Sequence, residues 1–189
     1  MAELRGRVIA SRKELVGAIM LGVVAGVVAS FAERVDATLT GGKYTPLGYV
    51  NTYVWILVAA TLFGPLAPVI TTEIQAFIGL LTFANPLSWL WPIVNFVFAV
   101  AAGFVSMALQ KFNQSAKLIT RVALMSLALA ILDIPMVYVV VVMVLGLPFI
   151  VYLLSLPVYM LLQLIPTTLV AYAVIKAILR SGVLRRVKG

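Results

Sequence analysis

The sequence predicts an all-α membrane protein with six transmembrane helices and both termini in the cytoplasm. It has 189 residues, of which 63% are hydrophobic and only 11% are charged. A water-soluble core of this length buries only about 70% of the unfolded surface, so lipid must solvate much of the rest. The length suits one domain, and residues 1–189 are expected to form a single membrane domain.

A helix needs about 20 apolar residues to cross the roughly 30 Å hydrocarbon core of a membrane, and six apolar segments approach this length. The expected helices cover residues 14–32, 47–63, 65–83, 90–110, 116–141 and a stretch within 149–179. Their outer connections are expected at 33–46, 82–91 and 146–157, and a short inner link at 63–65. The extra length around residues 141–156 is interpreted as an outer loop or interfacial turn, because Gly146, Pro148 and Pro157 punctuate it.

The placement of the basic residues predicts the topology. Twelve of the fourteen precede the first helix, surround the junction of the fourth and fifth, or follow the sixth: Arg5, Arg7, Arg12, Lys13, Lys111, Lys117, Arg121, Lys176, Arg180, Arg185, Arg186 and Lys188. Only Arg34 and Lys43 fall in the first outer loop, where Glu33 and Asp36 offset them. The positive-inside rule then places both termini in the cytoplasm, and it explains the basic composition without nucleic acid.

The composition excludes several kinds of chemistry. The chain has no cysteine and no histidine, which excludes disulfides, thiolate nucleophiles and imidazole bases. Neither a GxxxxGK[ST] nor a convincing GxGxxG pattern occurs, so uphill movement of a solute would draw on a partner or an ion gradient. We therefore expect no enzyme activity, catalytic residue, metal or cofactor.

Two acidic residues, Glu73 and Asp133, lie deep within apolar segments. A carboxyl group in hydrocarbon is costly unless it is paired, protonated or facing water, and it marks a functional site by default. The alternative is a neutral acid that is hydrogen-bonded between helices. We expect Glu73 to contact a ligand, so that Glu73→Gln weakens binding by about 1–3 kcal/mol.

Further polar and aromatic residues recur at the outer level of the expected helices. Asn95, Tyr159 and Gln163 are polar positions within the fourth and sixth helices, and Trp89, Trp91 and Tyr53 supply aromatic rings. Individually these residues are typical of interhelical hydrogen bonding or of an interfacial aromatic belt. Together with Glu73 and Asp133 they predict a polar pocket that opens to the outside and can stack a flat heterocycle.

The first helix carries a face of small residues, formed by Ala18, Gly22, Ala25, Gly26 and Ala29. Such a face lets another helix approach closely. The approaching helix could belong to this chain or to another protein.

Six helices in a chain of about 20 kDa, with a small-residue face on the first, resemble the substrate-capture (S) component of an energy-coupling factor (ECF) transporter. The segment Thr72-Glu-Ile-Gln-Ala76 followed by Asn85-Pro86 is similar to a Ser-Glu-Ile-x-Ala…Asn-Pro pattern of the YkoE group. This resemblance implies capture of thiamine or hydroxymethylpyrimidine from outside. It also implies a prokaryotic plasma membrane and docking, through the small-residue face, on a coupling transmembrane subunit driven by two ATPases.

Two other functions fit the same residues. A self-sufficient proton-coupled transporter would use Glu73 and Asp133 as a proton relay. A structural or assembly protein would use its buried carboxyl groups only to join helices.

Overall fold

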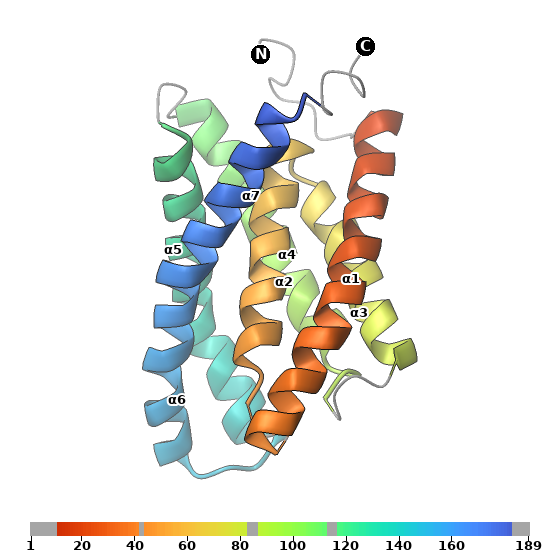
Figure 1. Ribbon diagram of the computed structural model, residues 1–189. Coiled ribbons are helices and arrows are strands. Elements are labelled where there is room, and N and C mark those ends of the chain that lie inside the picture. The colour runs from red at the N-terminus through yellow and green to blue at the C-terminus, as the bar shows by residue number, and fades with distance from the viewer. Residues whose placement is uncertain (1–10, 42–43, 83–86, 113–116, 183–189) are drawn as a thin grey trace.

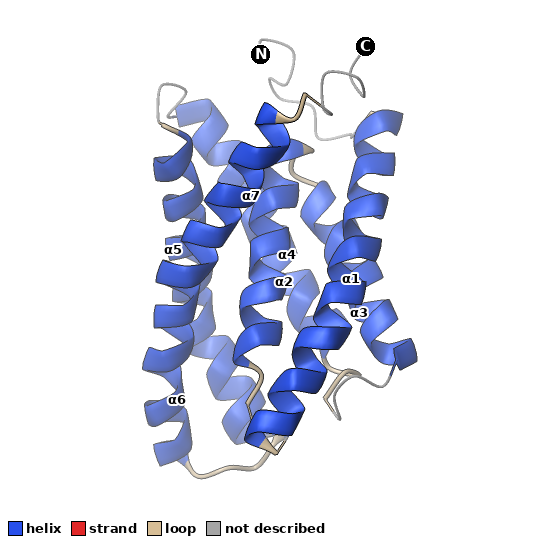
Figure 2. Cartoon of the chain, in the orientation of Figure 1, coloured by secondary structure: helices blue, strands red, loops and turns tan. Residues whose placement is uncertain are grey.

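A computed structural model describes residues 11–41, 44–82, 87–112 and 117–182 of the chain. Within these ranges every regular element is helical, which confirms the predicted all-α class (Figure 2). The helices are α1 (Arg12–Thr40), α2 (Pro46–Leu62), α3 (Ala67–Thr82), α4 (Trp91–Phe112), α5 (Leu118–Tyr138), α6 (Phe149–Leu162) and α7 (Thr168–Arg180). A π-helical segment, η1 (Val139–Val144), extends α5, and a second, η2 (Gln163–Thr167), joins α6 to α7 into one rod.

Four of the described rods are long and apolar enough to cross a membrane, so the protein is membrane-embedded. They are Arg12–Thr40, Trp91–Lys111, Leu118–Val144 and Phe149–Arg180. The other two helices are apolar but shorter, with 17 residues in α2 and 16 in α3. The prediction of six crossings therefore stays a prediction, although six helical rods are present in the described part of the chain.

The two ends of the bundle differ in charge. The start of α1, the end of α4 and the end of α7 lie together at one end (Figure 1). These positions carry Arg12, Lys111 and Arg180. The α1–α2 and α5–α6 connections lie at the opposite end. This arrangement is the one that the positive-inside prediction requires, while six of the basic residues used for it (Arg5, Arg7, Lys43, Arg185, Arg186 and Lys188) lie outside the described residues.

The first helix is longer than predicted. Instead of ending near residue 32, α1 continues to Thr40 and ends at Gly41, whose φ of 65° is left-handed. The expected outer loop from residue 33 is therefore wrong over its first two turns. The helix continues because Glu33 and Asp36 extend the buried face that Ala25 and Ala29 begin, at helical spacing.

The α5–α6 connection is shorter than predicted. The chain is helical to Val144 and again from Phe149, which leaves only residues 145–148 between the helices. Gly146 makes the turn with a φ of 63°, and Pro157 lies inside α6 rather than in a loop. In hydrocarbon the backbone must satisfy its hydrogen bonds internally, so this apolar stretch stays helical and tolerates its proline.

The small-residue face of α1 packs within the chain. Ala18, Ala25 and Ala29 are fully buried, and Gly22 and Gly26 are buried with them. A Cβ added to Gly22 would lie 2.8 Å from the Thr71 carbonyl oxygen of α3, so these backbones are in close approach. The structure thus shows the neighbouring-helix alternative, because α2 and α3 of the same chain cover these five residues. Large apolar side chains cover the opposite face of α1.

Candidate functional site

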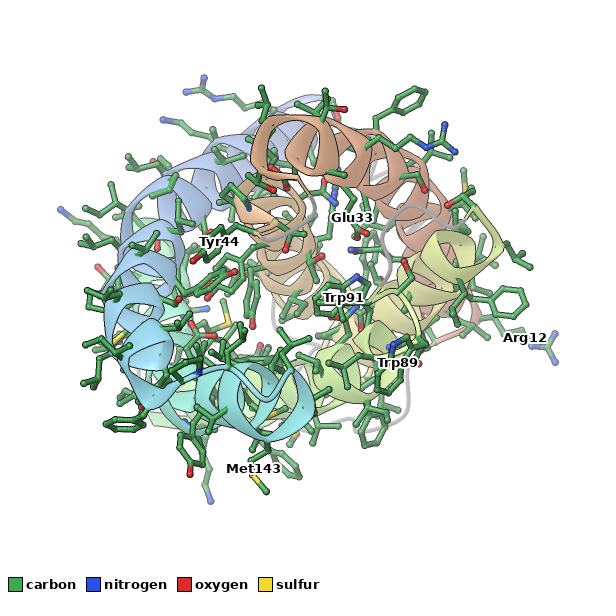
Figure 3. All side chains as sticks on the ribbon, turned by 90° about the horizontal axis from the view of Figure 1, so that it is seen from below. Arg12, Glu33, Tyr44, Trp89, Trp91 and Met143 are labelled. Carbon is green, nitrogen blue, oxygen red and sulfur yellow. The ribbon has the colours of Figure 1, made fainter. Side chains whose placement is uncertain are left out.

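A cavity of about 580 Å³ opens between the helices at the end of the bundle opposite the basic residues. Its wall is built from the end of α1, the start of α2, the end of α3, the start of α4, the end of α5 with η1, and the start of α6. Figure 3 looks along the helices from this end, and the side chains of Glu33, Tyr44 and Trp91 point inward there. Met143 and Arg12 point outward in the same view.

Five of the eight side chains predicted to bind a ligand line this cavity: Tyr53, Trp91, Asn95, Asp133 and Tyr159. They come from α2, α4, α5 and α6, so the fold brings together residues that are more than 100 positions apart. The other three, Glu73, Trp89 and Gln163, are not among the lining residues.

Asp133 belongs to a hydrogen-bonded cluster with two tyrosines of α2. It is 1% exposed and accepts a short hydrogen bond from the Tyr49 hydroxyl and a second from Tyr53 at 3.3 Å. The Tyr49 ring lies 4.4 Å from that of Tyr53 and 4.9 Å from that of Tyr159, measured between centroids. The cluster therefore gives the cavity an aromatic wall. Its two hydrogen bonds also offset the energetic cost of burying the Asp133 carboxyl group.

The three predicted residues outside the cavity lie on α3 (Glu73), in η2 (Gln163) and in the turn before α4 (Trp89). Glu73 is half-buried on α3, and its Oε1 has no hydrogen-bond partner. Gln163 is fully buried, and its side-chain Nε2 donates to the Ser126 hydroxyl at 3.2 Å, while that hydroxyl donates to the backbone carbonyl of Gln163 at 2.6 Å. Trp89 is 55% exposed. The prediction of a binding role for Glu73 therefore gains no support from its position.

The cavity contains an acidic residue that sequence reasoning assigned to a loop. Glu33 on α1 lines the cavity and is 5% exposed. Its Cγ lies close to α2, because a Cβ added to Gly48 would be only 2.8 Å from it. The signal that could have found Glu33 is its spacing: it lies four residues after Ala29, on the same face of the helix.

Asp36, one turn further along α1, holds α2 in place. Its Oδ1 accepts the Leu47 amide at 3.1 Å, and its Oδ2 accepts the Gly48 amide at 2.8 Å. These amides belong to the first turn of α2, whose N-cap residue Thr45 makes no side-chain cap hydrogen bond. Asp36 therefore supplies the cap and the negative charge that a helix N-terminus favours.

Three other polar atoms at the cavity have no hydrogen-bond partner. They are Glu33 Oε2, Gln75 Oε1 and Trp91 Nε1, and each atom is itself buried. The residues come from α1, α3 and α4, and all three line the cavity. We call these residues the unpaired triad. Glu33 and Trp91 point toward one another (Figure 3), and the indole N–H interacts with the Glu33 carboxyl group without completing a hydrogen bond of good geometry.

The carboxyl groups of the cavity are not balanced by basic side chains in the described residues. Two carboxyl groups, Glu33 and Asp133, contribute to the wall, and no lysine or arginine is found among the lining residues of the described ranges. Aromatic rings from Tyr49, Tyr53 and Tyr159 contribute to the remainder, together with aliphatic side chains from the end of α5 and from η1. Such a wall can attract a positively charged group through both its carboxyl groups and the faces of its rings.

Comparison with family models, with curated proteins and with solved structures gives no match for this chain. The likeness to the ECF transporters therefore still depends on the residue pattern alone. Of that pattern, Gln75 and Ala76 line the cavity, whereas Glu73 does not. The Asn85-Pro86 pair lies outside the described residues.

Proposed function

We propose that this protein is a solute-binding membrane subunit that captures a small, positively charged or N–H-rich organic molecule in the cavity. The observation that carries the proposal is an aromatic cavity with two carboxyl groups and no basic residue among its described lining. The volume of about 580 Å³ lies within the usual range for small-molecule sites.

The position of the cavity supports capture from outside the cell. It opens at the end of the bundle away from Arg12, Lys111 and Arg180. If the positive-inside rule holds for this chain, that end faces outward. A solute would then reach the cavity without passing between the basic helix ends.

Within this function we favour the S component of an ECF-type ABC vitamin transporter, in a prokaryotic plasma membrane. The support is the resemblance around residues 72–86, together with the lack of a nucleotide-binding motif in the sequence. Energy would come from a coupling transmembrane subunit and two ATPase subunits. Thiamine and hydroxymethylpyrimidine are the favoured solutes, because an aminopyrimidine offers donors to carboxyl groups and a flat face to tyrosine rings.

The direct test is to purify the protein in mild detergent, extract any bound small molecule and identify it by mass spectrometry. Titration with thiamine and with hydroxymethylpyrimidine would follow, using tryptophan fluorescence, because Trp91 lines the cavity. We expect saturable quenching that is lost in Tyr53→Ala, a change in the cavity wall, and kept in Phe77→Ala, an exposed position on α3. A failure of every cationic or N–H-rich solute to bind would overturn the proposal.

One observation favours a second candidate, a self-sufficient proton-coupled transporter. Glu73 is an acid on a membrane helix, half-buried, with an oxygen that has no partner. Such a group could carry a proton during transport. This candidate predicts uptake that follows a pH gradient in vesicles containing this chain alone, which the S-component proposal does not.

A further inference from the structure

The unpaired triad combines burial with a position at the cavity wall. Glu33 is 5% exposed and Gln75 is 3% exposed, yet one oxygen of each lacks a hydrogen-bond partner. The Trp91 indole N–H is also buried; it faces the Glu33 carboxyl group and interacts with it, but it completes no hydrogen bond of good geometry. Leaving a buried polar atom without a partner costs about 1–3 kcal/mol, so native proteins rarely do it without a reason.

The surrounding hydrogen bonds fix which atom of Gln75 is left unpaired. The Thr52 hydroxyl donates its single proton to the Gly48 carbonyl at 3.0 Å. It can therefore only accept from Gln75, and the Gln75 Nε2 donates to it at 2.5 Å. The carbonyl oxygen of Gln75 is consequently the atom left without a partner, as an acceptor.

The position of Glu33 is equally constrained. The Asp36 cap fixes the start of α2 against α1, and Gly48 packs directly on the Glu33 side chain. Asp36 and Glu33 are three residues apart on one helix, but the two carboxyl groups differ in one respect. Both oxygens of Asp36 accept amide protons, whereas Oε2 of Glu33 accepts none.

From this geometry we propose that Glu33, Gln75 and Trp91 are the specificity-determining residues of the cavity. The solute presents two hydrogen-bond donors, one to Glu33 and one to Gln75, and one acceptor to the Trp91 N–H. The triad thus forms hydrogen bonds with one polar edge of the solute, while the tyrosine rings around Asp133 stack against its flat face. This inference rests on the proposed function, because it assumes that the cavity holds a solute.

One consequence can be measured without any solute. If the triad is left unpaired in the empty protein, an apolar side chain of similar size should relieve the penalty. We expect Glu33→Met to raise the melting temperature of ligand-free protein by about 2–4 °C. The matched control, Asp36→Asn, should lower it, because that carboxyl group is fully paired. A lowered melting temperature for Glu33→Met would overturn the proposal, since it would show that Glu33 serves stability.

The second measurement tests recognition directly, by calorimetric titration with two probes. The first is hydroxymethylpyrimidine, whose amino group donates beside a ring nitrogen, and the second has a methyl group in place of that amino group. Wild-type protein should bind the first at least about tenfold more tightly, the factor that one lost charge-assisted hydrogen bond represents. Glu33→Met and Trp91→Phe should both abolish this preference. Trp89→Phe, at an exposed tryptophan outside the cavity, should keep it.

The two measurements separate the possible failures. Equal binding of both probes to wild-type protein, or a preference that survives in Glu33→Met, would overturn the assignment of the triad. Absence of binding by either probe would count against hydroxymethylpyrimidine as the solute of the proposed function. The melting temperatures of Glu33→Met and Asp36→Asn would then show, without any solute, whether Glu33 is left unpaired in the empty cavity as proposed.

Discussion

The Asp36 carboxylate of α1 accepts the backbone amide of Gly48 in α2 at 2.8 Å, and its other oxygen accepts the amide of Leu47 at 3.1 Å. This contact joins two consecutive helices at the end of the bundle where the cavity opens. It also sets the distance between Glu33 on α1 and the first cavity-lining residues of α2. One side chain therefore contributes both to folding and to the shape of the site.

Removal of this cap should destabilise the protein. We expect Asp36→Ala to lower the free energy of unfolding by about 2 kcal/mol, because two amides at a partly buried helix start lose their acceptor. Thr45→Ala is the control, since Thr45 is the N-cap residue by position but makes no side-chain cap bond. Denaturant unfolding in detergent would measure both. Equal effects of the two substitutions would contradict the assigned role of Asp36.

Two glycines of the cavity wall should respond differently to an added methyl group. In Gly48→Ala the new Cβ would lie 2.8 Å from Glu33 Cγ, so we expect a loss of about 1–3 kcal/mol and weaker solute binding. Gly79 also lines the cavity, but a Cβ there meets nothing within 4 Å. Gly79→Ala should leave stability nearly unchanged. Thermal melting with and without solute checks both expectations.

The hydrogen bonds between Asp133 and the tyrosines should be coupled energetically. We expect Tyr49→Phe to cost about 1–3 kcal/mol of stability, because it leaves a buried carboxyl oxygen with fewer donors. In an Asp133→Leu background the same substitution should cost much less, as a double-mutant cycle would show. If the stability losses of Tyr49→Phe and Asp133→Leu simply add in the double variant, the hydrogen bond between Tyr49 and Asp133 does not stabilise the protein.

Glu73→Gln distinguishes the two candidate functions. Because Glu73 lies outside the cavity, we now expect this substitution to leave solute affinity within about twofold of wild type, contrary to the expectation from sequence. A proton-coupled transporter would instead lose uptake driven by a pH gradient in reconstituted vesicles. Ser126→Ala provides a control for loss of a polar group between membrane helices, since Ser126 bonds to Gln163 and not to the cavity.

The sequence predicted the helices well because long apolar segments and their breaks are local properties. The expected second helix, residues 47–63, differs by one residue at each end from Pro46–Leu62. The first helix was predicted too short, since Glu33 and Asp36 were interpreted as loop residues, and the end of the fifth was predicted at residue 141, whereas η1 continues it to Val144. In the structure Glu33 and Asp36 are buried within α1, because the partners that accommodate them come from α2.

The site was predicted only in part, because the position of a residue along a membrane helix does not show which way its side chain points. Glu73 and Gln75 lie at nearly the same depth on α3, but a helix turns about 200° in two residues. The packing of α3 on α1 and α2 places Gln75, and not Glu73, at the cavity. Asp133 lines the cavity, and its predicted role in binding stays a prediction; its tyrosine partners, 84 and 80 residues away, could not be inferred from local sequence.

The glycine contacts of α1 have a consequence for where sensitivity to mutation should appear. Gly22, Gly26, Glu33 and Asp36 occupy one face of a single rigid rod, which packs on α3 at its middle and reaches the cavity near its end. A bulkier residue at Gly22 would push α1 away from α3 and tilt it. The tilt would displace the Glu33 side chain, which lies about 16 Å further along the helix axis. Selection for altered solute preference should therefore recover substitutions at these remote glycines as well as in the pocket wall.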